Sequence, residues 1–168
     1  VALVNAIIPN YKLVWGGQPA ITPIIHDIFK KRGFDYNKHI TIYQSNYFSG
    51  EMPKENQQFD NVILTQEVRC HADKKRNISE SLAIMRKRML TDNPIYAGVF
   101  IGGMEGVLDE YKLLMKYSNE KAEVYPIAST GAAALILYQN LTHQGINCNP
   151  RLLTDYCYAS LFEDLLNR

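Results

Sequence analysis

Short apolar segments alternate with longer segments of helical spacing along most of this chain. Residues 97–101 form a continuous apolar run, as expected for a parallel strand that is buried on both faces. Alternation of strands and helices over this length predicts an α/β fold with a mostly parallel central sheet wrapped by helices. The expected strands are residues 12–15, 40–43, 61–64, 97–101 and 123–127. The expected helices are residues 22–31, 79–91, 106–117, 131–142 and a last one from Asn149 or Pro150 to about residue 166. At its start, Asn149 can cap and Pro150 suits the first helical position.

Composition and length fit one folded domain spanning residues 1–168. The chain is 46% apolar, which is ordinary for a globular protein, and its net charge of +1 gives no electrostatic reason to bind nucleic acid. Neither a signal peptide nor an apolar run long enough to span a membrane is visible, so a cytoplasmic location is expected. Residues 1–8 have the pattern of a helix end. This start predicts a domain excised from a longer protein, without its first strand.

The thiols and imidazoles show no metal-binding pattern. Cys70, Cys148 and Cys157 are far apart with no CxxC spacing, which fits a reducing compartment better than a disulfide framework. The four histidines are dispersed along the chain. We therefore expect neither a metal ion nor a cofactor.

Three expected strands lead into glycine-containing turns that open helices, at residues 14–19, 100–106 and 126–133. Glycines allow close approach of the backbone to a ligand, and amides at a helix start attract phosphate. One such turn is explained by a tight backbone alone, whereas three at the carboxyl edge of one sheet indicate a phosphate-bearing ligand. None is a Walker A loop or the fingerprint G-x-G-x-x-G. The candidate ligand-binding residues of these turns are Gly16, Gly17, Gln18, Gly102, Gly103, Met104, Glu105, Gly106, Ser129, Thr130 and Gly131.

Acidic side chains follow the second glycine turn. Glu105 and Glu110 fall in the first turns of the expected helix, where they could simply complement the helix dipole. A carboxylate near a ribose can instead accept bonds from its hydroxyls, or stabilise an oxocarbenium-like transition state. The spacing leaves both interpretations open.

Basic and polar candidates lie on neighbouring elements. Arg86 and Arg88, on the helix expected at residues 79–91, form either a solvated basic face or a guanidinium site for phosphate. Gln44 and Ser45 close the strand expected at residues 40–43 and point to the same edge of the sheet.

Several motifs together resemble those of one superfamily. They are residues 13–23 (LVWGGQPAITP), residues 42–45 (IYQS), residues 81–89 (SLAIMRKRM) and residues 98–110 (GVFIGGMEGVLDE). The chain is similar over nearly its whole length to the SLOG superfamily, and most of all to a bacterial cluster with two glycine motifs. The superfamily includes the LONELY GUY phosphoribohydrolases, relatives of DNA-processing protein A, and sensor domains of TRPM channels and of anti-phage systems.

The resemblance implies a Rossmann-like fold that binds nucleotides or their derivatives. One hypothesis is a sensor of an ADP-ribose or NAD-derived signal in bacterial defence or signalling. The alternative is a phosphoribohydrolase of the LONELY GUY type, with Glu110 or Glu105 and Arg86 as catalytic residues. Hydrolases of that type carry P-G-G-x-G-T-x-x-E. This chain has Ile101 for the proline, one extra residue before Gly106 and Val107 for the threonine.

The expected partners follow from the same resemblance. They are a nucleotide-derived small molecule and an effector or TIR-type domain in the same protein or operon. No nucleic acid or membrane partner is expected for this segment. An apolar stripe near the end of the chain would suit packing within the domain or a contact in a homo-oligomer. Its members are Leu152, Leu153, Tyr156, Cys157, Leu161, Leu165 and Leu166.

Overall fold

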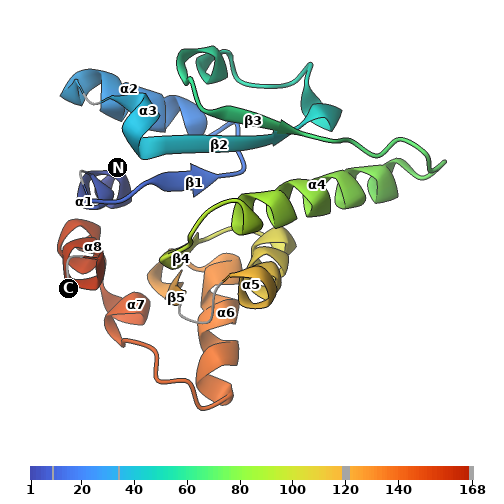
Figure 1. Cartoon of the computed structure of the whole chain (residues 1–168). Coiled ribbons are helices and arrows are strands. Elements are labelled where there is room, and N and C mark those ends of the chain that lie inside the picture. The colour runs from blue at the N-terminus through green and yellow to red at the C-terminus, as the bar shows by residue number, and fades with distance from the viewer. Residues whose placement is uncertain (9, 34, 119–121, 167–168) are drawn as a thin grey trace. The chain divides into compact units, whose positions relative to one another are not determined.

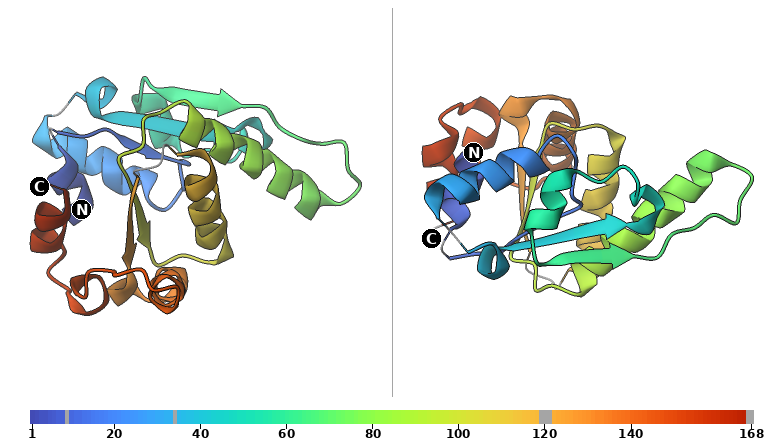
Figure 2. Two further views of the ribbon diagram at one scale, coloured as in Figure 1. Left: turned by 60° about the horizontal axis from the view of Figure 1, so that its bottom comes forward. Right: turned by 90° about the horizontal axis from the view of Figure 1, so that it is seen from above.

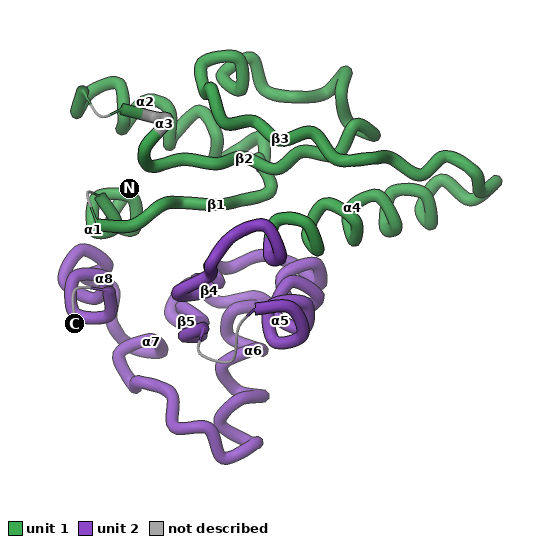
Figure 3. Tube along the Cα trace, viewed as in Figure 1, with its two compact units in different colours: residues 1–89 green, residues 90–168 purple. Residues whose placement is uncertain are grey.

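The computed structural model describes residues 1–8, 10–33, 35–118 and 122–166. The chain divides into two compact units, residues 1–89 and residues 90–168 (Figure 3). Each unit has its own parallel strands with helices packed against them, so each is described by itself.

The first unit contains a three-stranded parallel sheet in the order β1-β2-β3. Leu13 of β1 lies opposite Ile40 of β2, and Ile42 lies opposite Val62 of β3. α2 and η2 lie on one side of this sheet and α4 lies on the other (Figures 1 and 2). The elements are α1 (Ala2–Ile7), β1 (Leu13–Trp15), α2 (Thr22–Arg32), α3 (Tyr36–His39), β2 (Ile40–Ser45), η1 (Asn46–Phe48), η2 (Lys54–Gln58), β3 (Val62–Thr65) and α4 (Lys74–Thr91).

Strand β2 is the most buried strand of the first unit. Ile40, Ile42 and Tyr43 are at most 1% exposed, and Phe29 of α2 is fully buried. Residues 42–45 are buried in succession, as expected for a central strand that is covered on both faces. The sequence predicted this strand, which extends two residues further to Ser45.

Helix α4 begins five residues before the expected start. The Asp73 carboxylate accepts a hydrogen bond from the Lys75 amide at 2.9 Å, and the Asp73 carbonyl accepts one from the Asn77 amide at 3.2 Å. Residues 69–77 look like a loop in sequence because they are polar. Asp73 caps the first turn, however, so only the part before residue 74 is loop.

The second unit contains the parallel pair β4-β5. Its buried core is formed by Leu90, Phe100, Leu114, Leu137 and Leu141. α5 and α6 lie on one side of the strand pair, and α7 and α8 on the other (Figure 1). The elements are β4 (Ala97–Ile101), α5 (Glu105–Tyr117), β5 (Glu123–Ile127), η3 (Ala128–Thr130), α6 (Ala132–His143), α7 (Arg151–Thr154) and α8 (Tyr158–Leu166).

The C-terminal segment is two helices, and the expectation of one continuous helix is wrong. α7 ends at Asp155, whose backbone is extended at φ −89° and ψ 128°. The Asp155 carboxylate accepts hydrogen bonds from the Cys157 amide at 2.7 Å and from Arg151, so it offers the chain an alternative to helical bonding. The expected cap is confirmed, because the Asn149 side chain accepts the Arg151 amide at 3.0 Å.

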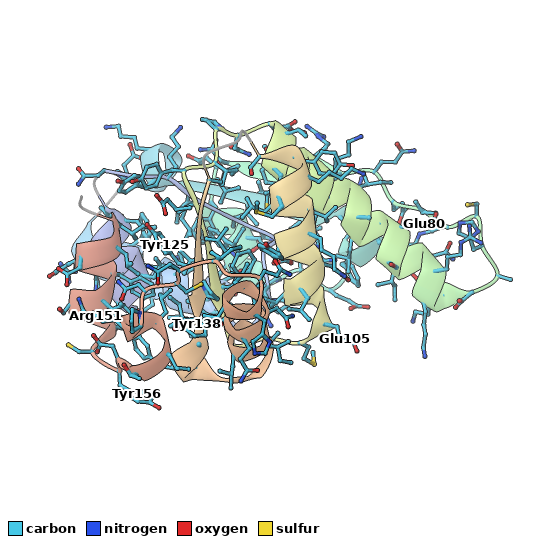
Figure 4. All side chains as sticks on the ribbon, turned by 90° about the horizontal axis from the view of Figure 1, so that it is seen from below. Glu80, Glu105, Tyr125, Tyr138, Arg151 and Tyr156 are labelled. Atoms are coloured by element: carbon cyan, nitrogen blue, oxygen red, sulfur yellow. The ribbon has the colours of Figure 1, made fainter. Side chains whose placement is uncertain are left out.

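The break at Asp155 also divides the apolar stripe. Leu152, Leu161, Leu165 and Leu166 are buried, whereas Leu153, Tyr156 and Cys157 are exposed. Tyr125 of β5 donates a hydrogen bond to the Leu165 carbonyl at 3.2 Å, which fixes α8 against the strand pair (Figure 4). The buried half of the stripe therefore packs within the second unit.

Parallel strands flanked by helices confirm the predicted α/β fold class. Four of the five expected strands share their first or last residue with the observed strand, and the other, β3, is shifted by one residue at each end. Within the described ranges, no helix is long and apolar enough to cross a membrane, and no cluster of three histidine, cysteine or acidic side chains could hold a metal ion.

Candidate functional site

The first glycine turn is held by a buried side chain from the neighbouring strand. The Gln44 amide nitrogen donates to the Gly17 carbonyl at 2.6 Å and to the Gly16 carbonyl at 3.4 Å. Gly17 has φ +60°, and a Cβ there would lie 1.8 Å from that same nitrogen. The turn after β1 therefore requires glycine for its backbone conformation and for its contact with Gln44.

The Gln18 side chain closes the turn that leads into α2. Its side-chain oxygen accepts hydrogen bonds from the Ala20 amide at 2.7 Å and the Ile21 amide at 3.0 Å. Two amides just before α2 are thereby satisfied inside the protein. Because Gln18 accepts their hydrogen bonds, those amides are not available to bind a phosphate.

Helix α4 packs beneath the same turn. A Cβ on Gly16 would lie 3.0 Å from the Cε atom of Met85, which is 4% exposed. Arg86, beside Met85, is half-buried and Arg88 is exposed. Ser45 is fully buried and its hydroxyl accepts the Tyr47 amide at 3.2 Å, so it caps η1.

The second and third glycine turns are tied together by Thr130. Its hydroxyl oxygen accepts a hydrogen bond from the Gly102 amide at 2.8 Å and donates one to the Ile127 carbonyl at 2.5 Å. The carbonyls of Gly102 and Gly103 accept the Ala134 and Ala133 amides, at 3.0 and 3.3 Å. The start of α6 is therefore bonded to the turn after β4, and its amides are already used.

The turn before α5, unlike the start of α6, has backbone amides that make no hydrogen bond to a described residue. Gly103 and Met104 are exposed, and no described residue accepts a hydrogen bond from either of their backbone amides. Gly102 and Gly103 have φ +54° and +82°, and a Cβ on Gly103 would lie 2.3 Å from Cγ2 of Val107. The turn thus presents two unused donors at the positive end of a 13-residue helix.

The third turn contains a strained residue that the sequence did not indicate. Ala132 has φ +51°, directly after Gly131 at φ +75°. Left-handed backbone is unfavourable for a residue with a Cβ, and such strain clusters at functional turns. Ser129 is used within the unit, because its hydroxyl lies 3.4 Å from that of Tyr158.

The carboxylates of α5 point in different directions around the helix. Glu105 is exposed at the first helical position (Figure 4), whereas Glu110 is half-buried. Five residues correspond to a rotation of about 140°. Asp109 is exposed and forms an ion pair with Lys112 at 3.4 Å. Among the carboxylates of α5, Glu105 is therefore the nearest along the chain to the free amides. Gly106 is the next residue of the first helical turn.

The candidate residues fall into two groups, one in each unit. Residues 16–18, 44–45, 86 and 88 belong to the first unit, and residues 102–106, 110 and 129–131 belong to the second. Within each group the hydrogen bonds above join residues that are far apart in sequence. That the two groups form one ligand site stays a prediction.

Sequence reasoning also passed over a pair in the first unit. Cys70 and His71 are adjacent, and their side chains touch in the structure. The adjacency itself was the available signal. The expectation that no histidine stands beside a cysteine overlooked this adjacency and is wrong.

A scan of family models identifies the chain. The model of the SLOG cluster3 family matches residues 1–166. No curated protein and no solved structure matches the chain. The family match agrees with the glycine turns and with the parallel, helix-flanked strands of both units. This chain therefore belongs to the SLOG cluster3 family and has its α/β, Rossmann-like fold.

Proposed function

We propose that this protein binds a nucleotide-derived signal, such as an ADP-ribose or NAD-derived molecule, in a bacterial defence or signalling system. Membership of the SLOG cluster3 family supports a nucleotide-related role. The observation that carries the proposal is the pair of unused amides at Gly103 and Met104. These amides bind a phosphate of the ligand.

The turn is suited to this task because its backbone is already fixed. The Thr130 hydroxyl holds Gly102, and the α6 amides hold the carbonyls of Gly102 and Gly103. An anion that docks here loses little binding free energy to ordering of the protein, because the donors are preorganised. The helix dipole of α5 adds a favourable field at the same point.

Glu105 supplies the second contact. Its exposed carboxylate follows the free amides directly and accepts hydrogen bonds from the ribose hydroxyls of the ligand. A carboxylate and two amide donors together favour a phosphorylated ribose over phosphate alone.

Binding without turnover is favoured over hydrolysis by the position of Glu110. The hydrolase motif places its glutamate at this position, yet Glu110 is half-buried and lies on another side of α5 from Glu105. The carboxylate beside the free amides is thus Glu105, whereas the glutamate of the hydrolase motif lies further along α5. The alternative function, cleavage of an N-glycosidic bond, remains an outcome of the test.

The test is a thermal-shift screen in which each mixture is then separated by chromatography. The panel contains nucleoside monophosphates, NAD, ADP-ribose and cyclic ADP-ribose isomers, with adenosine as the phosphate-free comparison. A ligand at 100 times its Kd adds about 2.7 kcal/mol to the free energy of unfolding. We expect a rise in Tm with one phosphorylated ligand, no rise with adenosine, and recovery of the ligand intact.

Two variants locate the site. Glu105→Ala should weaken binding of the ligand found in the screen, whereas Glu123→Ala, an exposed glutamate at the opposite end of β5, should not. Equal affinity in both variants would place the site elsewhere. Free base in the chromatogram, lost in a Glu110→Gln variant, would show hydrolysis instead of sensing.

A further inference from the structure

Helices α5 and α6 of the second unit lie side by side, with a groove between them (Figure 1). The groove holds a cavity of about 360 Å³. Its apolar lining is formed by Leu137 and Leu141 of α6 and by Leu108 and Tyr111 of α5. Leu137 and Leu141 belong to the buried core of this unit, so the floor of the groove is packed from beneath. These side chains take no part in the glycine turns.

Two carboxamides of α6 lie at the rim of the groove. Asn140 and Gln144 are exposed and four residues apart, which puts both on one face of the helix. In the part of the chain that the structure describes, neither carboxamide takes part in a hydrogen bond. Each therefore offers two N–H donors and one carbonyl acceptor to a molecule in the groove.

The spacing of these carboxamides matches that of an extended peptide. Four residues of an α-helix rise about 6 Å along its axis. Two residues of an extended strand rise about 6.6 Å, and alternate side chains of such a strand point to the same face. A peptide that lies along α6 can therefore pair the backbone groups of alternate residues with Asn140 and Gln144, while every second side chain enters the groove.

Other apolar occupants fit the groove less well. A helix uses its backbone groups internally and leaves both carboxamides without partners, and an acyl chain has no polar group to offer them. A second folded copy of the chain needs about 800 Å² of buried surface on each partner. The groove follows α6 only from residue 137 to residue 144, which is about 10 Å.

Lys112 gives the groove a preferred charge. Its ammonium group belongs to the lining on the α5 side and lies 3.4 Å from the Asp109 carboxylate. These two side chains are 73% and 59% exposed, so their ion pair is weak and costs little to exchange for another. Asp109 itself does not line the groove. The lining thus complements a carboxylate on the peptide.

We propose that the groove between α5 and α6 binds an extended peptide segment of a partner protein. The segment has apolar side chains at alternate positions and an acidic group beside Lys112. Asn140 and Gln144 hold its backbone, and the leucines of the floor receive its apolar side chains. This site is separate from the phosphate-binding turn and does not rest on the proposed function.

The experiment measures binding of the whole chain to fluorescein-labelled synthetic peptides by fluorescence anisotropy. Each six-residue peptide carries leucine, valine or tyrosine at its second and fourth positions, polar residues elsewhere and aspartate at one end. Each is compared with forms that are methylated on alternate backbone nitrogens, in both registers, which removes N–H donors and keeps the side chains. We expect saturable binding of at least one peptide and binding about tenfold weaker after methylation in one register.

Substitutions locate the peptide in the groove. Asn140→Ala and Gln144→Ala should each raise the Kd of that peptide about threefold to tenfold, because each removes hydrogen bonds to the backbone. Gln139→Ala is the matched control, since it removes an exposed carboxamide of the same helix that lies outside the groove, and it should leave the Kd unchanged. Unchanged urea midpoints would show that all three variants fold.

A second pair of variants tests the charge. Lys112→Gln should abolish the preference for a peptide that ends in aspartate over the same peptide with asparagine. Lys116→Gln, at an exposed position one turn further along α5 and outside the groove, should keep that preference.

The proposal is overturned if no peptide of the set binds, or if methylation has no effect in either register. It is also overturned if Asn140→Ala and Gln144→Ala change the Kd no more than Gln139→Ala does. A native chain that elutes as a dimer in size-exclusion chromatography, and that Gln144→Arg converts to a monomer, would assign the groove to a second copy instead.

Discussion

Thr130 accepts a hydrogen bond from the Gly102 amide at 2.8 Å, across 28 residues of sequence. The same hydroxyl donates to the Ile127 carbonyl, so one side chain joins the turns that follow β4 and β5. Neither turn has this geometry from its own residues alone. The exposed amides of Gly103 and Met104 belong to the turn that this connection holds, and the predictions below test this contact and others.

Thr130→Val should lower the free energy of unfolding by about 1–3 kcal/mol, because it leaves the Gly102 amide without its acceptor while keeping the side-chain shape. Urea unfolding measures this change. Thr142→Val is the control, since the exposed Thr142 hydroxyl only returns a bond to its own helix, and its effect should stay within about 0.5 kcal/mol. A Thr130 variant as stable as the control would contradict the role of this hydroxyl.

Gly17→Ala should be more destabilising than Gly33→Ala. Both glycines have positive φ, +60° and +65°, so each substitution costs about 1–2 kcal/mol of backbone strain. Only Gly17 has a neighbour in the way, namely the Gln44 amide nitrogen at 1.8 Å from the added carbon, while nothing lies within 4 Å at Gly33. Urea midpoints for the two variants test this. Equal midpoints would show that Gln44 does not constrain the turn.

The Gly17 and Gln44 substitutions should also be non-additive. Gly17→Ala already displaces the Gln44 side chain, so Gln44→Ala should cost less in that background than in the native protein. A double-mutant cycle on the free energies of unfolding measures the coupling. Additive effects would mean that the two residues act independently.

Ala132→Gly should raise the free energy of unfolding by up to about 1 kcal/mol. The residue has φ +51°, where glycine avoids the left-handed strain but loses more entropy on folding. Ala134→Gly, two residues later and fully buried inside α6, should instead lower it by about 1 kcal/mol. Thermal unfolding should therefore show a higher Tm for Ala132→Gly and a lower Tm for Ala134→Gly. A lower Tm in both variants would refute the strain at Ala132.

The contribution of Asp155 to stability should disappear in acid. The Cys157 amide and then Arg151 hold the pKa of Asp155 below its ordinary value of 3.8. A carboxylate whose pKa is lower in the folded state than in the unfolded state stabilises the protein at pH values above its unfolded-state pKa. This stabilisation is lost as the pH falls through the folded-state pKa. The difference in urea midpoint between the native protein and Asp155→Asn should therefore be constant from about pH 7 to pH 5 and shrink below about pH 4.

The control for this titration is Asp27→Asn. Asp27 forms an exposed helical ion pair with Lys31, with side chains 56% and 74% exposed, and such pairs contribute little. Its effect on the midpoint should be small at neutral pH. A flat pH dependence for Asp155→Asn would show that the α7–α8 turn does not rely on the carboxylate.

Local sequence patterns predicted those strands and helices whose formation depends on residues close together in the chain. The continuous apolar run at Ala97–Ile101 and the segment Glu123–Ile127 are strands with the expected bounds. Asn149 before Pro150 marked a helix start for the same local reason. The family resemblance likewise rested on short motifs and is confirmed over residues 1–166.

The sequence by itself thus determined the α/β class, the strands and the glycine turns. Only the tertiary structure decided that Gln44 holds the first glycine turn, that Thr130 joins the second turn to the third, and that Glu80 is placed against His71. The physical reason is the range of the interactions. Hydrophobic periodicity and helix capping act within a few residues, whereas the bonds from Gly102 to Thr130 and from Gln44 to Gly17 join residues 28 and 27 positions apart. Such bonds form only once folding has brought the turns together.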